Sequence, residues 1–119
     1  MAVKILIKRT FKENKLREAT KLLIEARFNA MAQEGYISSE NMVDMSNPNK
    51  VVVASMLQKI ENWENWKNSK LRETNEVKLE KLLKALVEYE PYVLGPTINN
   101  NKRDAQKFNA SPLFSKMSC

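Results

Sequence analysis

Two tryptophans in segment 60–69, IENWENWKNS, are the side chains best suited to bind an aromatic compound. Trp63 and Trp66 are three positions apart, so in a helix they share one face. Each combines a large apolar ring with an N–H group that needs an acceptor when it is buried. Such a pair can line a pocket, or it can simply pack in the core between a helix and a sheet. The spacing alone leaves both interpretations open.

Most other kinds of site lack the residues that they need. The chain contains no histidine, which removes the usual acid/base group at neutral pH, the commonest metal ligand and a histidine-ligated haem. Histidine-dependent serine and cysteine nucleophiles are excluded for the same reason. The only glycines, Gly35 and Gly95, are too far apart for a phosphate-binding loop. We therefore expect neither a metal nor another cofactor.

Pairs of carboxylates occur in the same region, but their surroundings favour a structural role. Glu61 and Glu64, like Glu73 and Glu76, are separated by three positions and stand near lysines. Charged residues at this spacing are typical of a solvated helix surface. The sequence thus predicts that these glutamates lie on the surface and contribute to solubility.

Charge and cysteine content restrict the class of protein further. The net charge is +6, yet residues 15–34 interleave basic with acidic side chains, which argues against nucleic-acid binding. No apolar run approaches 18 residues, so we expect no membrane span. The N-terminus has a strand pattern and does not resemble a signal peptide. Cys119 is the single cysteine and excludes an intrachain disulfide, so the expected compartment is the reducing cytoplasm.

Apolar periodicity predicts alternating strands and helices. Residues 2–10 alternate with a period of two, which is typical of a strand. Further strands are expected at 36–45, 50–59 and 87–94. Helices are expected at 15–34, closed by Gly35, at 60–69, and in a further stretch that carries Val77, Leu79, Leu82, Leu83 and Leu86.

This order predicts an α+β fold, the ferredoxin-like βαββαβ arrangement with a four-stranded antiparallel sheet. Right-handed crossovers place strands 2–10 and 50–59 at the centre and strands 36–45 and 87–94 at the edges. Pro91 agrees with this order, because proline cannot donate to a strand ladder and is confined to edges or bulges.

The strand at 50–59 is apolar on both faces, although two helices can cover only one face of a four-stranded sheet. Val51, Val53 and Leu57 point to one face, and Val52, Ala54 and Met56 alternate with them. An apolar sheet face without a helix layer needs another covering. We therefore expect a homodimer packed sheet against sheet.

Residues 96–119 differ in composition from the predicted domain at 1–95. They contain an asparagine run and hold four basic residues against one acidic residue. This composition predicts a basic tail outside the core, extended or disordered, or laid on a neighbouring surface.

Residues 51–69, VVVASMLQKIENWENWKNS, resemble the strand–helix junction of the antibiotic biosynthesis monooxygenase (ABM) family. Trp63, Trp66, Asn68 and Ser69 stand at the matching positions, and the predicted element order also fits. The resemblance implies a dimeric α+β barrel with a cavity between sheet and helices. Some members of the family are cofactor-independent monooxygenases that oxidise polycyclic aromatic compounds with O₂, and others degrade haem.

The resemblance also assigns candidate site residues. Trp66 is the expected catalytic residue lining the cavity, and Trp63, Asn68 and Arg9 are the expected substrate-binding residues. In the haem-degrading branch, a histidine ligand lies where this chain has Glu76, and an asparagine lies where it has Lys8, followed by Arg9. Both differences count against haem degradation.

The sequence thus supports a cofactor-independent monooxygenase that acts on a small aromatic or quinone-like compound. Two alternatives remain open. One is a protein of the same fold that binds a small apolar ligand without turnover. The other is an interaction protein that acts through its tail.

Overall fold

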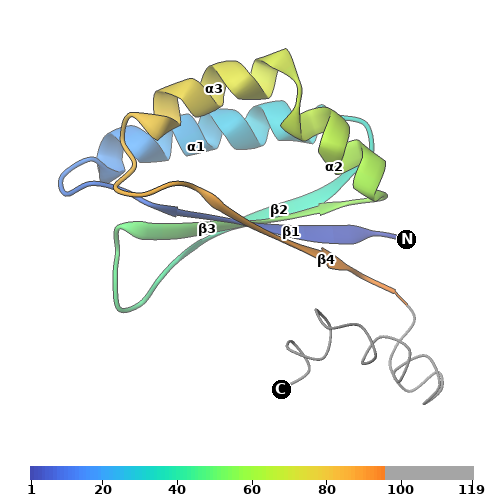
Figure 1. The fold of residues 1–119 in the computed structure, drawn as a ribbon, viewed down its shortest axis with the longest axis horizontal. Coiled ribbons are helices and arrows are strands. Elements are labelled where there is room, and N and C mark those ends of the chain that lie inside the picture. Colours follow the sequence, from blue (N-terminus) through green and yellow to red (C-terminus); the bar gives the residue numbers. More distant parts are fainter. Residues whose placement is uncertain (96–119) are drawn as a thin grey trace.

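A computed structural model describes residues 1–95 and contains four strands and three helices in this part of the chain (Figure 1). The predicted tail at 96–119 and Cys119 lie outside the described residues. Within residues 1–95 no helix is long and apolar enough to cross a membrane. In chain order the elements are β1 (Val3–Thr10), α1 (Leu16–Met31), β2 (Tyr36–Val43), β3 (Lys50–Leu57), α2 (Ile60–Lys67), α3 (Lys70–Glu80) and β4 (Glu88–Val93).

The four strands form one antiparallel sheet in the order β2-β3-β1-β4. The predicted α+β ferredoxin-like fold is therefore confirmed, with β1 and β3 at the centre. Pro91 lies in the edge strand β4 opposite Ile5, in agreement with its missing N–H donor. Burial explains the arrangement, because the two most apolar strands occupy the two positions with a neighbour on each side.

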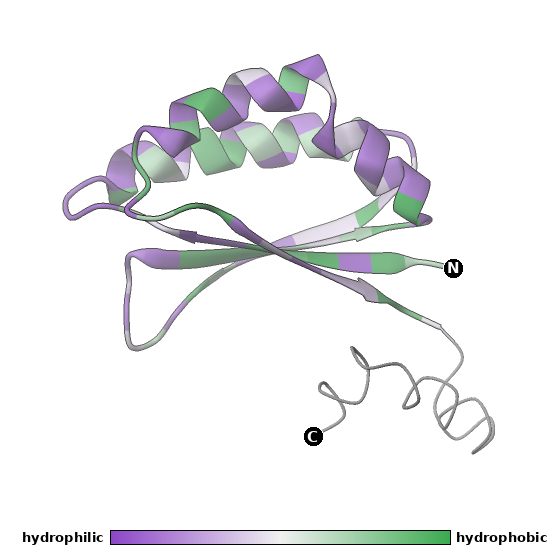
Figure 2. Cartoon of the chain, in the orientation of Figure 1, coloured by the Kyte–Doolittle hydropathy of each residue, from purple (hydrophilic) through white to green (hydrophobic). Residues whose placement is uncertain are grey.

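All three helices lie on one face of the sheet (Figure 1). Along β1, Val3, Ile5 and Ile7 are buried towards the helices, and the alternating residues are more exposed. Apolar residues dominate β3 and are mixed with polar ones along β1, whereas polar residues dominate α2 (Figure 2). No helix or strand of residues 1–95 covers the opposite face of the sheet. Because successive side chains of a strand point to opposite faces, every second residue lies on this open face.

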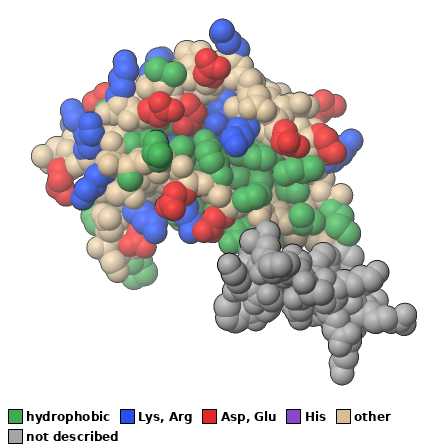
Figure 3. Space-filling model, in the orientation of Figure 1, with side chains coloured by type: hydrophobic (Ala, Val, Ile, Leu, Met, Phe, Trp, Pro, Cys, Tyr) green, Lys and Arg blue, Asp and Glu red, His purple; other side chains and the backbone are tan. Residues whose placement is uncertain are grey.

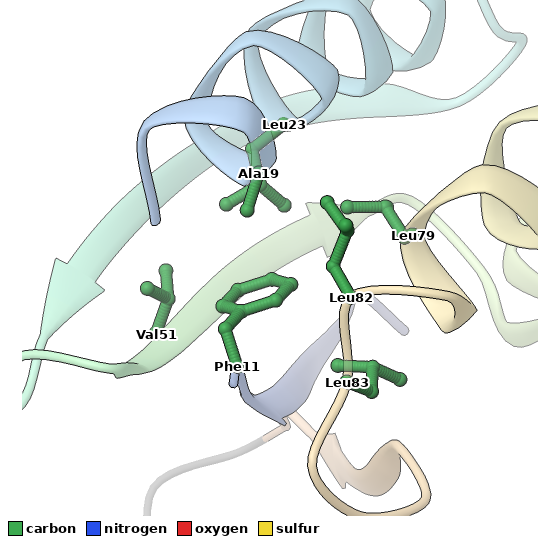
Figure 4. Packing of buried hydrophobic residues seen from close by; sticks show 7 residues of the cluster. All are labelled: Phe11, Ala19, Leu23, Val51, Leu79, Leu82 and Leu83. Atoms are coloured by element: carbon green, nitrogen blue, oxygen red, sulfur yellow. The ribbon is translucent and has the colours of Figure 1, made fainter. Parts of the chain in front are cut away.

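The core contains two apolar clusters at different positions along the sheet. Figure 4 shows one of them, in which the ring of Phe11 points from the end of β1 towards Ala19 of α1 and Leu82. The other cluster surrounds the two tryptophans and comprises Val3, Ile5, Ile7, Leu57, Trp63 and Trp66. Arg9 follows Ile7 by two residues and precedes Phe11 by two, so β1 places a buried cation between the clusters.

On the side of the molecule seen in Figure 3, apolar side chains gather below the helices, between groups of charged side chains. Isolated apolar residues on a surface need no special explanation, whereas a contiguous patch suggests a contact or a site.

The last helix is shorter than the leucine spacing predicts. α3 ends at Glu80, and Leu82 and Leu83 follow in a turn closed by hydrogen bonds from their N–H groups to Leu79 and Glu80. Leu83 then pairs with Phe11 in an isolated bridge. Tertiary pairing with the end of β1 thus overrides helical periodicity, and Leu86 is 90% exposed, so its expected place in a helix face was wrong.

Gly35 has a different role from the predicted helix-closing one. α1 already ends at Met31 and is capped by Ala32, so Gly35 lies in the turn that enters β2. Its φ of +83° lies in the left-handed region that favours glycine. A Cβ at this position would also overlap the side chain of Asn62, whose Oδ1 accepts a hydrogen bond from the Lys59 N–H at the start of α2.

We predict that Gly35→Ala lowers the free energy of unfolding by more than the backbone cost of about 1–2 kcal/mol, because Asn62 must also move. Urea denaturation of Gly35→Ala, Asn62→Ala and the double variant separates the two parts. The cost of Gly35→Ala should fall towards the backbone value when Asn62 is alanine. An equal cost in both backgrounds would contradict the proposed overlap with Asn62.

Candidate functional site

A small cavity lies between the sheet and the helix layer, with a volume of about 40 Å³. Its walls come from α1, α3, the end of α2 and the three strands β1, β2 and β3. Arg27 of α1 and Asn41 of β2 also line the cavity and are exposed, so the cavity reaches solvent between these elements. All of these walls come from a single chain.

The two tryptophans occupy different places relative to this cavity. Both are buried, at 5% exposure for Trp63 and 6% for Trp66, and both belong to the same apolar cluster. Trp66 also lines the cavity, whereas Trp63 does not. The ring of Trp63 instead packs against Tyr89, with 5.7 Å between the ring centroids. Core packing and cavity lining are therefore divided between the two residues.

A buried group of charges forms the polar side of the cavity. Arg9 and Arg72 both form ion pairs with Oε1 of Glu76, and all three side chains line the cavity. Glu76 is only 8% exposed. The prediction that it lies on the helix surface was therefore wrong: on α3 the side that bears Glu76 faces the sheet, where the inward-pointing Arg9 of β1 provides its counter-charge.

The start of α3 sets the direction of its polar face. Ser69 is the N-cap, and its Oγ accepts a hydrogen bond from the Arg72 N–H at 3.2 Å. A cap fixes where the helix begins and therefore which residues face inward. Arg72, Asn75 and Glu76 are spaced by three and four positions, so they share the face that is turned to the cavity.

Arg72 is also held by aromatic rings on its other side. Its guanidinium carbon is 5.3 Å from the centroid of the Trp63 ring and 5.5 Å from that of Tyr89. Its Nη2 donates to the Tyr89 hydroxyl at 3.1 Å. These contacts link the buried ion pairs to the tryptophan cluster. Trp63 therefore holds Arg72 in place at the cavity, although Trp63 itself does not line the cavity.

Two buried polar atoms beside the cavity have no hydrogen-bond partner, Nε of Arg9 and Oδ1 of Asn75. The Nδ2 of Asn75 donates to the Leu22 carbonyl at 3.4 Å, which leaves Oδ1 as the free end of that amide. Burial lowers the pKa of Arg9, and the nearby Glu76 opposes this shift. A buried donor or acceptor without a partner is costly, so both atoms are suited to meet water or a ligand in the cavity.

The remaining predicted residues lie elsewhere. Asn68 is the exposed C-cap of α2 and does not line the cavity in this structure. Lys8 points to the open face of the sheet, where its Nζ lies 2.8 Å from Oε2 of Glu90. Arg9 is the substrate-binding candidate that does line the cavity, as Trp66 also does.

Sequence reasoning missed several polar residues that line the cavity, namely Ser39, Ser55, Arg72 and Asn75. For the residues on strands, the alternation of inward and outward positions could have identified them. Ser55 continues the inward series of Val51, Val53 and Leu57, and Arg9 continues that of β1. Polar residues at core-facing positions are unusual and often indicate a site.

The volume of the cavity restricts what it can hold. A buried water needs roughly 10–15 Å³ of such space, and a cavity of about 150 Å³ accommodates benzene. The cavity of about 40 Å³ therefore has room for a few waters or a few ligand atoms. An aromatic ring requires the walls to move apart. Among residues 1–95 no cluster of three potential metal-ligating side chains exists.

Comparison with known proteins identifies the fold. The sequence matches no family model and no curated protein. A conserved protein from Methanosarcina mazei Go1 aligns with a TM-score of 0.75 at 17% identity, over 80% of this chain and 94% of that one. SnoaB, a cofactor-independent oxygenase from Streptomyces nogalater, aligns with a TM-score of 0.72 at 11% identity, over 82% and 96%.

An antibiotic biosynthesis monooxygenase also aligns, with a TM-score of 0.73 at 10% identity, over 79% of this chain and 99% of that structure. The structural neighbours of this chain are thus ABM domain proteins, in agreement with the resemblance in the sequence. At these identities the likeness shows the fold.

We predict that Glu76→Gln lowers the free energy of unfolding by about 3–5 kcal/mol, because Arg9 and Arg72 lose their shared counter-charge while they stay buried. Glu73→Gln, at an exposed position of the same helix, should change it by no more than about 0.5 kcal/mol. Urea denaturation of the two variants beside the unaltered protein measures both values. Equal, small effects would show that the buried ion pairs do not stabilise the fold.

Proposed function

We propose that this chain is a cofactor-independent monooxygenase of the ABM type, acting on a small aromatic or quinone-like compound bound in the cavity beside Trp66. The observation that carries the proposal is the cavity itself, which is lined by the indole of Trp66 and by two residues with buried polar atoms that lack partners, Arg9 and Asn75. An aromatic wall with few convergent polar groups is typical of small-molecule sites. The structural likeness to a cofactor-independent oxygenase supports the same reaction class.

In the proposed reaction the substrate supplies all the electrons. A CH₂ group flanked by aryl and carbonyl-conjugated rings is oxidised to C=O by O₂. One oxygen atom enters the product, and the other leaves as water with the two substrate hydrogens. The protein contributes binding, orientation and exclusion of water, with the ring stacked on Trp66 and an oxygen substituent held by Arg9.

One observation favours binding without turnover as a second candidate. Glu76 is the only carboxylate among the described residues that line the cavity, and it is paired with two arginines. Both arginines bind its Oε1, so this carboxylate is already engaged in holding them in place. If neither another group nor solvent deprotonates the substrate, no oxidation follows and the protein binds its ligand without turnover.

We predict oxygen-dependent conversion of 1,8-dihydroxyanthrone to the corresponding anthraquinone above the rate without protein, with one O₂ consumed per substrate. Trp66→Phe should lower kcat/KM by about tenfold or more, since a displaced aromatic wall weakens substrate orientation. Absorbance and an oxygen electrode measure the reaction in aerobic and anaerobic samples.

Trp63→Phe is the matched control, because it removes an indole of similar burial that does not line the cavity and keeps an aromatic ring beside Arg72. A similar loss for both variants would mean that Trp66 only packs in the core. Quenching of tryptophan fluorescence without an oxygen-dependent product would support the binding protein instead.

We also propose that two copies associate through the open faces of their sheets. Leu6 of β1 lies opposite Ala54 of β3, and Val52 lies opposite Met42 of β2, so these side chains form one apolar patch with Met56. Leu6, Val52 and Met56 are half-exposed, and Met42 is 43% exposed. Burial of such a patch is the main driving force for association.

We predict that Val52→Lys converts a dimer to a monomer in sedimentation velocity at micromolar concentration, because the lysine charge would be buried in the contact. Phe28→Lys is the control, since Phe28 lies on the helix layer and is 74% exposed. This variant should remain dimeric. A stable monomer of the unaltered protein at the same concentration would disprove the proposed association.

A further inference from the structure

The charged groups that line the cavity are strongly unbalanced. Among the described lining residues, Arg9, Arg27 and Arg72 are cationic and Glu76 alone is anionic, which gives the cavity a net charge of +2. Arg9 and Arg72 are buried, at 4% and 7% exposure, so solvent screens them little. A buried excess of positive charge favours an anionic guest over a neutral one of the same shape.

The unpaired atoms define the chemistry of that guest more closely. Nε of Arg9 is a donor without an acceptor, and Oδ1 of Asn75 is an acceptor without a donor. Both belong to residues that line the same cavity. An oxyanion would accept from Arg9 in a charge-assisted hydrogen bond, and a neighbouring hydroxyl would donate to Asn75. Glu76 occupies another nitrogen of Arg9, Nη2, so the Nε–H remains free for this contact.

We propose that the ligand of this cavity is an aromatic anion, with an oxyanion bound by Arg9 and an adjacent hydroxyl bound by Asn75. The inference rests on the proposed function only in placing the ring beside Trp66. The cavity of about 40 Å³ must widen to admit any ring, and a single ring requires less widening than a polycyclic one. Arg27, at the exposed end of the cavity, attracts the anion as it enters.

Salicylate is a suitable probe, because it carries a carboxylate next to a hydroxyl on one ring. Isothermal titration calorimetry of the full chain at neutral pH would compare it with benzoate, which lacks the hydroxyl, and salicylamide, which lacks the charge. Salicylate should bind about tenfold or more tightly than salicylamide, since a charged hydrogen bond is replaced by a neutral one. Benzoate should bind with intermediate affinity.

Two variants test the contact of Arg9 with the oxyanion and that of Asn75 with the hydroxyl separately. Arg9→Gln should weaken salicylate binding by about tenfold or more, whereas Arg17→Gln, an exposed charge of α1 outside the cavity, should leave it unchanged. Asn75→Ala leaves the ion pairs in place. It should weaken the binding of salicylate and leave that of benzoate unaltered, which keeps the test valid if Arg9→Gln does not fold.

The outcomes separate this inference from the proposed reaction. Equal binding of salicylate and salicylamide, no binding of either at millimolar concentration, or full retention of salicylate binding in a folded Arg9→Gln variant would overturn the anion site. Oxygenation of an anthrone could still occur in each case. Selective salicylate binding that depends on Arg9 and Asn75, without any oxygen-dependent product, would support the anion site and contradict the monooxygenase.

Discussion

The buried ion pairs between Glu76 of α3 and the two arginines, Arg9 and Arg72, are the constraint on which the rest of the structure depends. Charges removed from water are costly unless each has a well-placed partner. Their pairing fixes how α3 lies over β1, and it divides the core into one cluster around Phe11 and another around the tryptophans. The cavity lies beside these charges, where neither apolar cluster fills the space between helices and sheet.

The three buried charges next to the cavity are costly to remove from water. Apolar side chains of the same volume would often be as stable or more stable, so the presence of three charges and an unpaired amide oxygen supports the binding role that we propose. Trp66 supplies an apolar part of the cavity lining, and Arg9 supplies a charged part. Trp63 and Tyr89 hold Arg72 by their rings, which connects the rigidity of the core to the geometry of the cavity.

The two faces of the sheet serve different purposes. The face towards the helices contains the core and the cavity, and the open face presents an apolar patch on β1, β2 and β3. Lys8 and Glu90 form an ion pair on this open face, and their mutual hydrogen bond raises the pKa of the lysine and lowers that of the glutamate. Since the pair is partly exposed, it contributes little to stability and defines the polar margin of the patch.

Local patterns in the sequence determined the order of strands and helices, the central place of β1 and β3, and the edge position of Pro91, because these follow from short-range periodicity and from the missing proline donor. The resemblance to the ABM family, and not the spacing, indicated that Trp66 lines the cavity. Only the tertiary structure decided that Trp63 stays behind the cavity, that α3 stops at Glu80, and that Glu76 is buried against Arg9. Residues 67 positions apart form that last contact, and no local spacing specifies which charged residue on a helix meets its partner across the core.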